Sequence, residues 1–154
     1  MEIYIDNRQD KIELTQVLEE LIKKAICASL EEEARTKNYE VSVSLVDNKE
    51  IRDLNKQYRN VDSATDVLSF PMDEDFGIGA PFLGDIIISV EKAMEQSKEY
   101  GHTIDREIAY LVVHSMFHLM GYDHLTKSDK DLMRKKEKSV MKYLNIYKAS
   151  EESS

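Results

Sequence analysis

Three of the four histidines lie close together, in the run His114-Ser-Met-Phe-His118-Leu-Met-Gly-Tyr-Asp-His124. His114 and His118 are four residues apart, so on a helix their imidazole rings project from the same face. Gly121 can end that helix in the left-handed conformation and turn the chain sharply, which would bring His124 back as a third ligand. Neutral imidazole suits zinc, copper, iron or nickel, and zinc is the commonest choice for three nitrogens. We predict that the three histidines hold one zinc ion.

A metal site with three protein ligands leaves one coordination position open, which is typical of a catalytic rather than a structural zinc. Zinc in such a site can lower the pKa of a bound water toward about 7 and so supply hydroxide. The alternative is that the histidines are gathered by accident; this would be the better interpretation of a single histidine, but not of three at this spacing. The fourth, His102, precedes a predicted helix and is expected to be solvated.

The same offsets occur in the metzincin protease pattern H-E-x-x-H-x-x-G-x-x-H. Ser115 stands where that pattern has the glutamate that acts as general base. A serine hydroxyl cannot replace a carboxylate base at neutral pH. A zinc-dependent peptidase therefore keeps the metal geometry in this sequence but loses its base.

Composition favours one soluble domain. The 154 residues are 42% hydrophobic and 33% charged, with 2 Pro and 5 Gly, and we assign residues 1–149 to a single domain and 150–154 to a frayed tail. The lone cysteine excludes a disulfide scaffold. The first residues lack the pattern of a signal peptide, and no run reaches the roughly 18 apolar residues of a membrane span. We expect a cytoplasmic protein with no membrane partner.

The net charge of -9 argues against non-specific binding to nucleic acid, because that affinity comes largely from Lys and Arg. It leaves room for a local basic patch.

Hydrophobic periodicity predicts the elements that must position the histidines. Strands are expected at 2–6, 39–46, 66–70 and 82–89, and helices at 12–30, 47–58, 90–100, 103–121 and 128–147, with a loop at 73–81. Ser89, Thr103 and Ser128 are expected to cap the last three helices. Strands alternate with helices at first and helices follow, which predicts a single α+β or α/β domain with about four strands and five helices, one of which carries the histidine pair as in metalloproteases.

The histidine run resembles the H-G-x-L-H-L-x-G-Y-D-H signature of the YbeY family. Further segments match in the family's order and spacing, so the resemblance covers about Val41 to His124. The departures are Ser115 and Phe117 in place of the usual Gly and Leu, and Asn60 in place of a Gly that often follows the arginine. The matching segments are Tyr58-Arg59-Asn60-Val61-Asp62, Thr65-Asp66-Val67-Leu68-Ser69-Phe70-Pro71 and Leu83-Gly84-Asp85-Ile86.

This resemblance implies an α+β fold that combines a mixed sheet with helices. It also implies a metal-dependent endoribonuclease that acts on single-stranded RNA. It implies maturation of ribosomal RNA, especially the 3′ end of the small-subunit RNA, and a part in ribosome quality control. The family's zinc-binding histidines map onto His114, His118 and His124, and its functionally important arginine maps onto Arg59. The ribosome, and a ribosomal protein or a GTPase that delivers the enzyme, are the partners expected from the family.

Arg59 has a physical role that fits this chemistry, because a planar guanidinium can hold two phosphoryl oxygens as negative charge develops on them. The nearby Arg52 and Lys56 are interpreted as a solvated helix face. Asp85 and Asp123 could orient a histidine or act as a base, and the sequence assigns neither role. Two alternatives stay open: a zinc-dependent peptidase, and a non-enzymatic ribosome-assembly factor whose zinc only shapes a surface.

Overall fold

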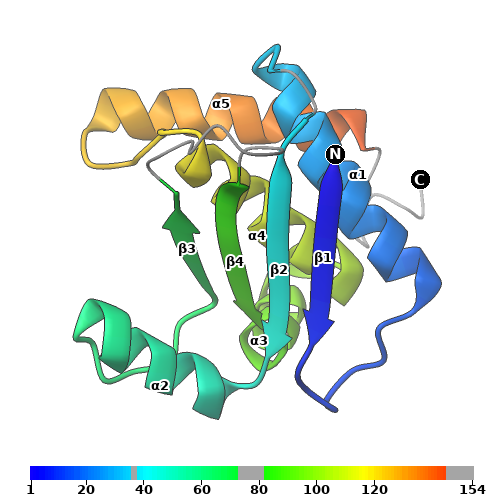
Figure 1. The fold of residues 1–154 in the computed structure, drawn as a ribbon, viewed down its shortest axis with the longest axis vertical. Coiled ribbons are helices and arrows are strands. Elements are labelled where there is room, and N and C mark those ends of the chain that lie inside the picture. Colours follow the sequence, from blue (N-terminus) through cyan, green and yellow to red (C-terminus); the bar gives the residue numbers. More distant parts are fainter. Residues whose placement is uncertain (36–37, 73–81, 145–154) are drawn as a thin grey trace.

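The computed structural model describes residues 1–35, 38–72 and 82–144. Within these ranges the chain forms one four-stranded sheet and five helices (Figure 1). This confirms the predicted α+β fold. The loop predicted at 73–81 and the tail at 150–154 lie outside the described residues. The strands are β1 (Glu2–Asn7), β2 (Glu40–Val46), β3 (Val67–Pro71) and β4 (Phe82–Ser89), and the helices are α1 (Gln16–Glu32), α2 (Asn48–Arg59), α3 (Val90–Tyr100), α4 (Ile104–Leu119) and α5 (Lys127–Tyr143).

The sheet is mixed, as the family resemblance implies, with the strand order β1-β2-β4-β3. Strands β1, β2 and β4 are parallel, and β3 pairs with β4 in the antiparallel direction at one edge. The apolar run in β4 predicts burial on both faces of the sheet. Ile86 and Ile88 are fully buried, whereas Ile87, which faces the other way, is only half-buried. The second face is therefore covered in part only.

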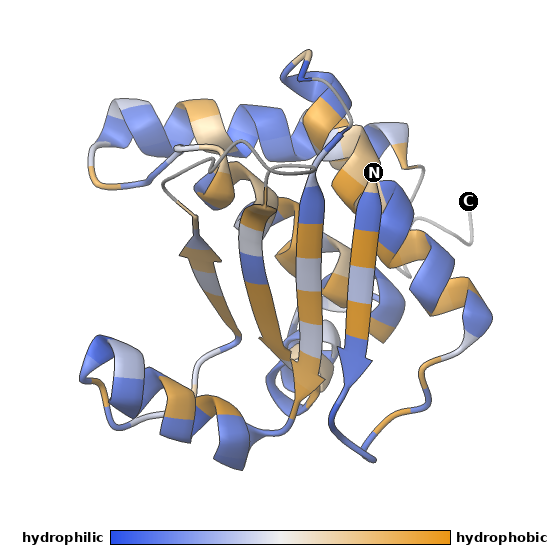
Figure 2. Cartoon of the chain, viewed as in Figure 1, coloured by the Kyte–Doolittle hydropathy of each residue, from blue (hydrophilic) through white to orange (hydrophobic). Residues whose placement is uncertain are grey.

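One face of the sheet carries the main core. Helices α1 and α4 lie behind the sheet in Figure 1, and Figure 2 shows hydrophobic and hydrophilic residues alternating along β1 and β2. The alternate residues Val41, Val43 and Leu45 of β2 meet buried side chains of α1, α3, α4 and α5. Each large apolar side chain buried in this way stabilises the fold by about 1.5–3 kcal/mol. A small second cluster on the opposite face is built around Ile51 of α2 and Leu68 of β3.

Side-chain caps set where the helices begin. Ser89 and Thr103 accept hydrogen bonds from the backbone N–H groups three residues on, as predicted for α3 and α4. Two predicted starts are wrong. The first helix begins after Thr15 rather than at residue 12, and the last is capped by Thr126 rather than by Ser128. In both cases the hydroxyl that reaches an N–H of the first turn decides the boundary, and periodicity alone does not reveal it. No described helix is long and apolar enough to cross a membrane.

Gly84 marks the closest approach of β3 to β4 and α4. Its φ is +153°, and a Cβ built there would lie 2.5 Å from the carbonyl oxygen of Phe70 and 2.7 Å from the Leu119 side chain. A side chain would therefore push β3 away from α4. Because the histidines are on α4, this glycine keeps the edge strand close to them.

We predict that Gly84→Ala lowers the free energy of unfolding by about 2–4 kcal/mol, since backbone strain and overpacking act together. Gly101→Ala is the matched control: its φ of +70° is also unfavourable for alanine, but nothing lies within 4 Å of the added Cβ. It should cost only about 1–2 kcal/mol. Urea unfolding of both variants measures the difference, and equal losses would contradict the steric argument.

Candidate metal centre

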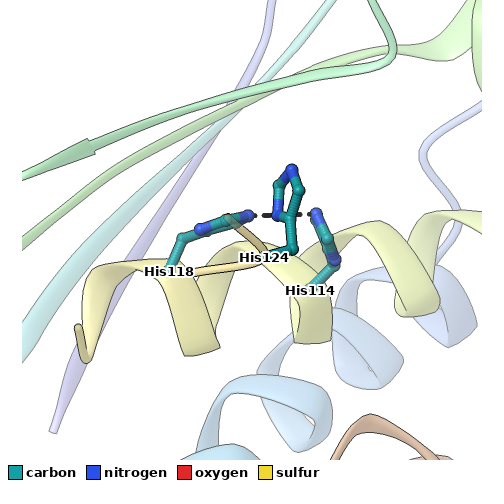
Figure 3. A group of neighbouring side chains, drawn as sticks. All are labelled: His114, His118 and His124. Carbon is teal, nitrogen blue, oxygen red and sulfur yellow. Dashed lines mark hydrogen bonds between the residues drawn. The ribbon is translucent and has the colours of Figure 1, made fainter. Parts of the chain in front are cut away.

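Helix α4 carries two of the three clustered histidines on one face, as their spacing predicts. The Nε2 atoms of His114 and His118 are 3.2 Å apart, and their rings meet edge to face with centroids at 4.7 Å (Figure 3). A tetrahedral zinc ion at 2.0–2.1 Å from its ligands separates two nitrogens by about 3.3 Å. The spacing of the pair therefore fits a shared ion.

The chain reverses at Gly121, as predicted. Gly121 has a φ of +99°, its N–H donates to the carbonyl of His118, and the next N–H, of Tyr122, donates to the carbonyl of Phe117. This is the Schellman pattern that ends many helices. The accompanying apolar contact is also present, because the rings of Tyr122 and Phe117 pack edge to face at 5.5 Å.

This reversal returns His124 to the helix. Its ring centroid lies 5.1 Å from that of His118 and 6.0 Å from that of His114. One nitrogen from each of the three rings lies within 4.8 Å of the others, so the group could hold a metal ion. Figure 3 shows the three rings gathered above the helix.

The partners of the outer ring nitrogens determine which nitrogens face the centre. His114 Nδ1 lies 2.6 Å from the carboxylate of Glu137, and His118 Nδ1 lies 3.0 Å from the carbonyl of Tyr122. Each acceptor holds the proton on Nδ1 and leaves the Nε2 lone pair directed inward. Two lone pairs facing each other at 3.2 Å repel unless a cation lies between them. The donor set thus fits a metal ion.

The surroundings of His118 also favour its neutral form, which can bind a cation. Burial, followed by the nearby His114 and His124, holds the pKa of His118 below its usual range. The imidazole is therefore neutral at physiological pH, which is the form that binds metal.

Glu137 is the carboxylate that sequence reasoning missed. It lies on α5, is buried, and also accepts a hydrogen bond from the Tyr110 hydroxyl. Asp123, one of the two acidic residues considered in its place, is exposed and accepts a hydrogen bond from the N–H of Leu125. A signal was present, because Glu137 interrupts the buried stripe Met133, Glu137, Val140 and Met141 on α5.

Asp85 points to the face of the sheet opposite the histidines. Its neighbours Gly84 and Ile86 face α4 and the main core, and successive residues of a strand face opposite sides. Burial raises the pKa of Asp85, and a hydrogen bond from Ser42 counteracts this in part. Asp85 is therefore not placed to orient a zinc ligand.

The structure brings Arg59 to the histidines. Its Nη2 donates to the carbonyl oxygen of Ser69 at 2.7 Å, and its guanidinium lies 4.8 Å from the centre of the Phe70 ring. Arg59 and all three histidines line one pocket of about 550 Å³, together with residues of β3. Asn60, which stands where the family often has glycine, adopts the left-handed conformation at the end of α2. Asparagine tolerates this conformation, so the departure is conservative.

Ser115 is buried, and most of the His102 side chain is covered. The Ser115 hydroxyl is 2.5 Å from that of Ser69, so it ties α4 to β3. The expectation that His102 is solvated is wrong: its side chain is 8% exposed, and Nε2 lies 2.5 Å from the buried carboxylate of Glu107. The turn that carries His102 folds back on α4, a contact that local sequence does not reveal.

Arg52 pairs with Asp62 at 2.8 Å on the exposed side of α2, in agreement with its interpretation as a solvated residue.

Fold and site together define an α+β protein with a cluster of three histidines, on α4 and just after it, that could hold a metal ion. The family model described as Endoribonuclease YbeY matches residues 4–145. The chain therefore belongs to the YbeY endoribonuclease family, and the resemblance seen in the motifs is confirmed.

Relatives agree with this assignment over nearly the whole chain. An Endoribonuclease YbeY from Finegoldia magna is 54% identical over 151 residues, which cover 98% of this chain and 99% of the relative. One from Clostridioides difficile is 50% identical over 150 residues, with 95% and 98% covered. A protein of Thermotoga maritima with a known solution structure is 30% identical, with a TM-score of 0.64 and coverage of 92% and 88%.

We predict that Glu137→Ala weakens zinc binding about 10- to 100-fold, because His114 loses the group that fixes its ring and its tautomer. Glu137→Gln keeps an oxygen that can accept the Nδ1 proton and should weaken it less. Competition with a chromophoric chelator measures both affinities. Asp131→Ala, at an exposed position of the same helix, is the control. Unchanged affinity in Glu137→Ala would show that the carboxylate does not support the site.

Proposed function

We propose that this chain is a zinc-dependent endoribonuclease specific for single-stranded RNA, which matures the 3′ end of small-subunit ribosomal RNA and takes part in ribosome quality control. The observation that supports it best is the shared pocket. Arg59 lies in the same pocket as His114, His118 and His124. A cation site beside a guanidinium suits a phosphodiester, whose transition state gathers negative charge.

In this proposal the three histidines hold one zinc ion, each through one ring nitrogen. Zinc, when bound, supplies a Lewis acid that polarises a phosphoryl oxygen and lowers the pKa of water. Glu137 and the Tyr122 carbonyl keep His114 and His118 in the tautomer that binds it. His124 is exposed and closes the site from the solvent side.

Arg59 is the proposed catalytic residue. A guanidinium carries five N–H donors, and in the described part of the chain one is bonded to the carbonyl of Ser69. That bond and the Phe70 ring hold the side chain against the edge strand β3, which lines the same pocket as the histidines. Further donors can then hold the phosphoryl oxygens of a substrate in the pocket.

Arg59 also gives an acidic protein a local site for RNA. Lys56 and Arg59 lie in the last turn of α2, and Arg59 brings its positive charge into the pocket. With a net charge of -9, long-range attraction to RNA is weak. Delivery by a ribosomal protein or a GTPase in the cytoplasm would supply what electrostatics does not.

A peptidase would need a general base at the position where metzincin proteases have their glutamate, and this chain has no carboxylate there. Ser115 replaces the glutamate, and its hydroxyl is engaged with Ser69. An assembly factor without activity would not require Arg59 beside an open metal site. Cleavage of single-stranded RNA but not of casein distinguishes the first alternative, and the variants below distinguish the second.

We predict that Arg59→Ala keeps one zinc per chain but lowers kcat on single-stranded ribosomal RNA by about 10²–10³, the usual effect of removing one donor to developing charge. His114→Ala should lose both zinc and activity, and chelator should abolish wild-type cleavage. Arg52→Ala is the matched control on α2, since Arg52 pairs with Asp62. Elemental analysis and an RNase assay with mapped 3′ ends test these outcomes. Cleavage equal in all variants would refute the nuclease assignment, and zinc retained in His114→Ala would refute the site.

A further inference from the structure

A second pocket adjoins the metal pocket. Its volume is about 450 Å³, within the range of small-ligand sites. The two pockets share Asp66 and His114, so a molecule in one lies next to the other. The remaining lining comes from α3, α4 and the turn between them: Gln96, Tyr100, His102, Arg106, Glu107, Tyr110 and Leu111.

The charges of this pocket do not suit a phosphate. Asp66 and Glu107 place two carboxyl groups on its wall, and Arg106 contributes one cation. Glu107 is 3% exposed and is paired with His102, whose side chain is 8% exposed. The carboxylates would repel a phosphate, which is better held in the metal pocket by Arg59 and a metal ion. A neutral ligand with hydrogen-bonding groups fits this wall better.

The polar groups are held in fixed positions. Asp66 accepts hydrogen bonds from the N–H of Val67 at 2.8 Å and from Gln96 Nε2 at 3.2 Å. The Tyr110 hydroxyl donates to Glu137, which is also the partner of His114. Polar side chains fixed by such bonds can read the edge of a ligand with little loss of conformational entropy.

An aromatic ring stands at the mouth of the pocket. Tyr100, the last residue of α3, is 55% exposed, although large apolar rings are usually covered. Its ring lies 6.1 Å from that of His102, with 36° between the planes. Exposed aromatic rings beside polar groups are the common platform for unstacked bases of single-stranded RNA.

We propose that this pocket is a nucleobase subsite, which takes the unpaired base of a nucleotide adjacent to the phosphate at the metal centre. Tyr100 stacks on the base, while Asp66 and Gln96 contact its polar edge. The inference rests on the proposed function, because it assumes that the neighbouring pocket binds RNA. A base inside a duplex could not enter the pocket, so the subsite gives a physical reason for a preference for single strands.

Binding can be measured apart from cleavage. Zinc-free protein in chelator is titrated with a fluorescein-labelled single-stranded RNA, and with a series in which an abasic nucleotide replaces each position in turn. Fluorescence anisotropy gives each affinity. We expect one abasic position to weaken binding by roughly 5- to 150-fold, the equivalent of about 1–3 kcal/mol for a stacked base.

Tyr100→Ala should weaken binding of the intact RNA by a similar factor and have little further effect on the RNA that is abasic at that position. Gln96→Ala should act on the same position. Tyr143→Ala, which removes another exposed tyrosine at the end of α5, is the control and should bind like wild type. Zinc stoichiometry and thermal unfolding should be unchanged in Tyr100→Ala.

The outcomes separate the two proposals. Either of two results would overturn the subsite, even if the zinc-loaded protein cleaves RNA. One is that every abasic RNA binds as tightly as the intact RNA. The other is that Tyr100→Ala weakens binding of the abasic RNA as much as it weakens binding of the intact RNA. Base-dependent binding that Tyr100→Ala abolishes, without cleavage by the zinc-loaded wild type, would support the subsite and count against the nuclease assignment.

Discussion

The reversal of the chain at Gly121 is the constraint on which the metal centre depends. Two histidines on one face of α4 offer only two nitrogens, and the third must come from outside the helix. The positive φ of Gly121 and the bonds from residues 121 and 122 to the carbonyls of His118 and Phe117 return His124 at once. The same Tyr122 also supplies the carbonyl that orients His118. One turn therefore ends the helix, returns His124 to the other two histidines and orients the His118 ring.

Helix α5 holds His114 of the histidine cluster in place through Glu137. Glu137 places a carboxylate among buried apolar side chains, which is costly unless the group is paired. His114 and Tyr110, both on α4, provide the two partners. A metal ion on His114 would strengthen this bond by making the Nδ1 proton more acidic, so the packing of α5 on α4 and metal binding would reinforce each other.

The edge strand β3 connects the metal centre with the groups around it. Ser69 accepts from Arg59 through its carbonyl and contacts Ser115 of α4 through its hydroxyl. The absence of a side chain at Gly84 lets β3 approach α4. Asp66, at the start of the strand, belongs to both pockets. A phosphate at the histidines and a base beside Tyr100 would thus be placed by a short, rigid segment, which is the arrangement that positions a flexible single strand.

The sequence by itself determined the order and type of the elements, the cluster of three histidines and the family. Helical spacing, a glycine and short motifs are local features, and local geometry converts them directly into structure. Arg59 could be named from its motif, but the pocket that it shares with the histidines could not be predicted. The tertiary structure alone decided that Glu137 rather than Asp123 orients His114, that Asp85 faces away, and that His102 is buried against Glu107. These contacts join elements far apart in the chain or depend on how a turn packs, and such packing leaves no periodic signal in the sequence.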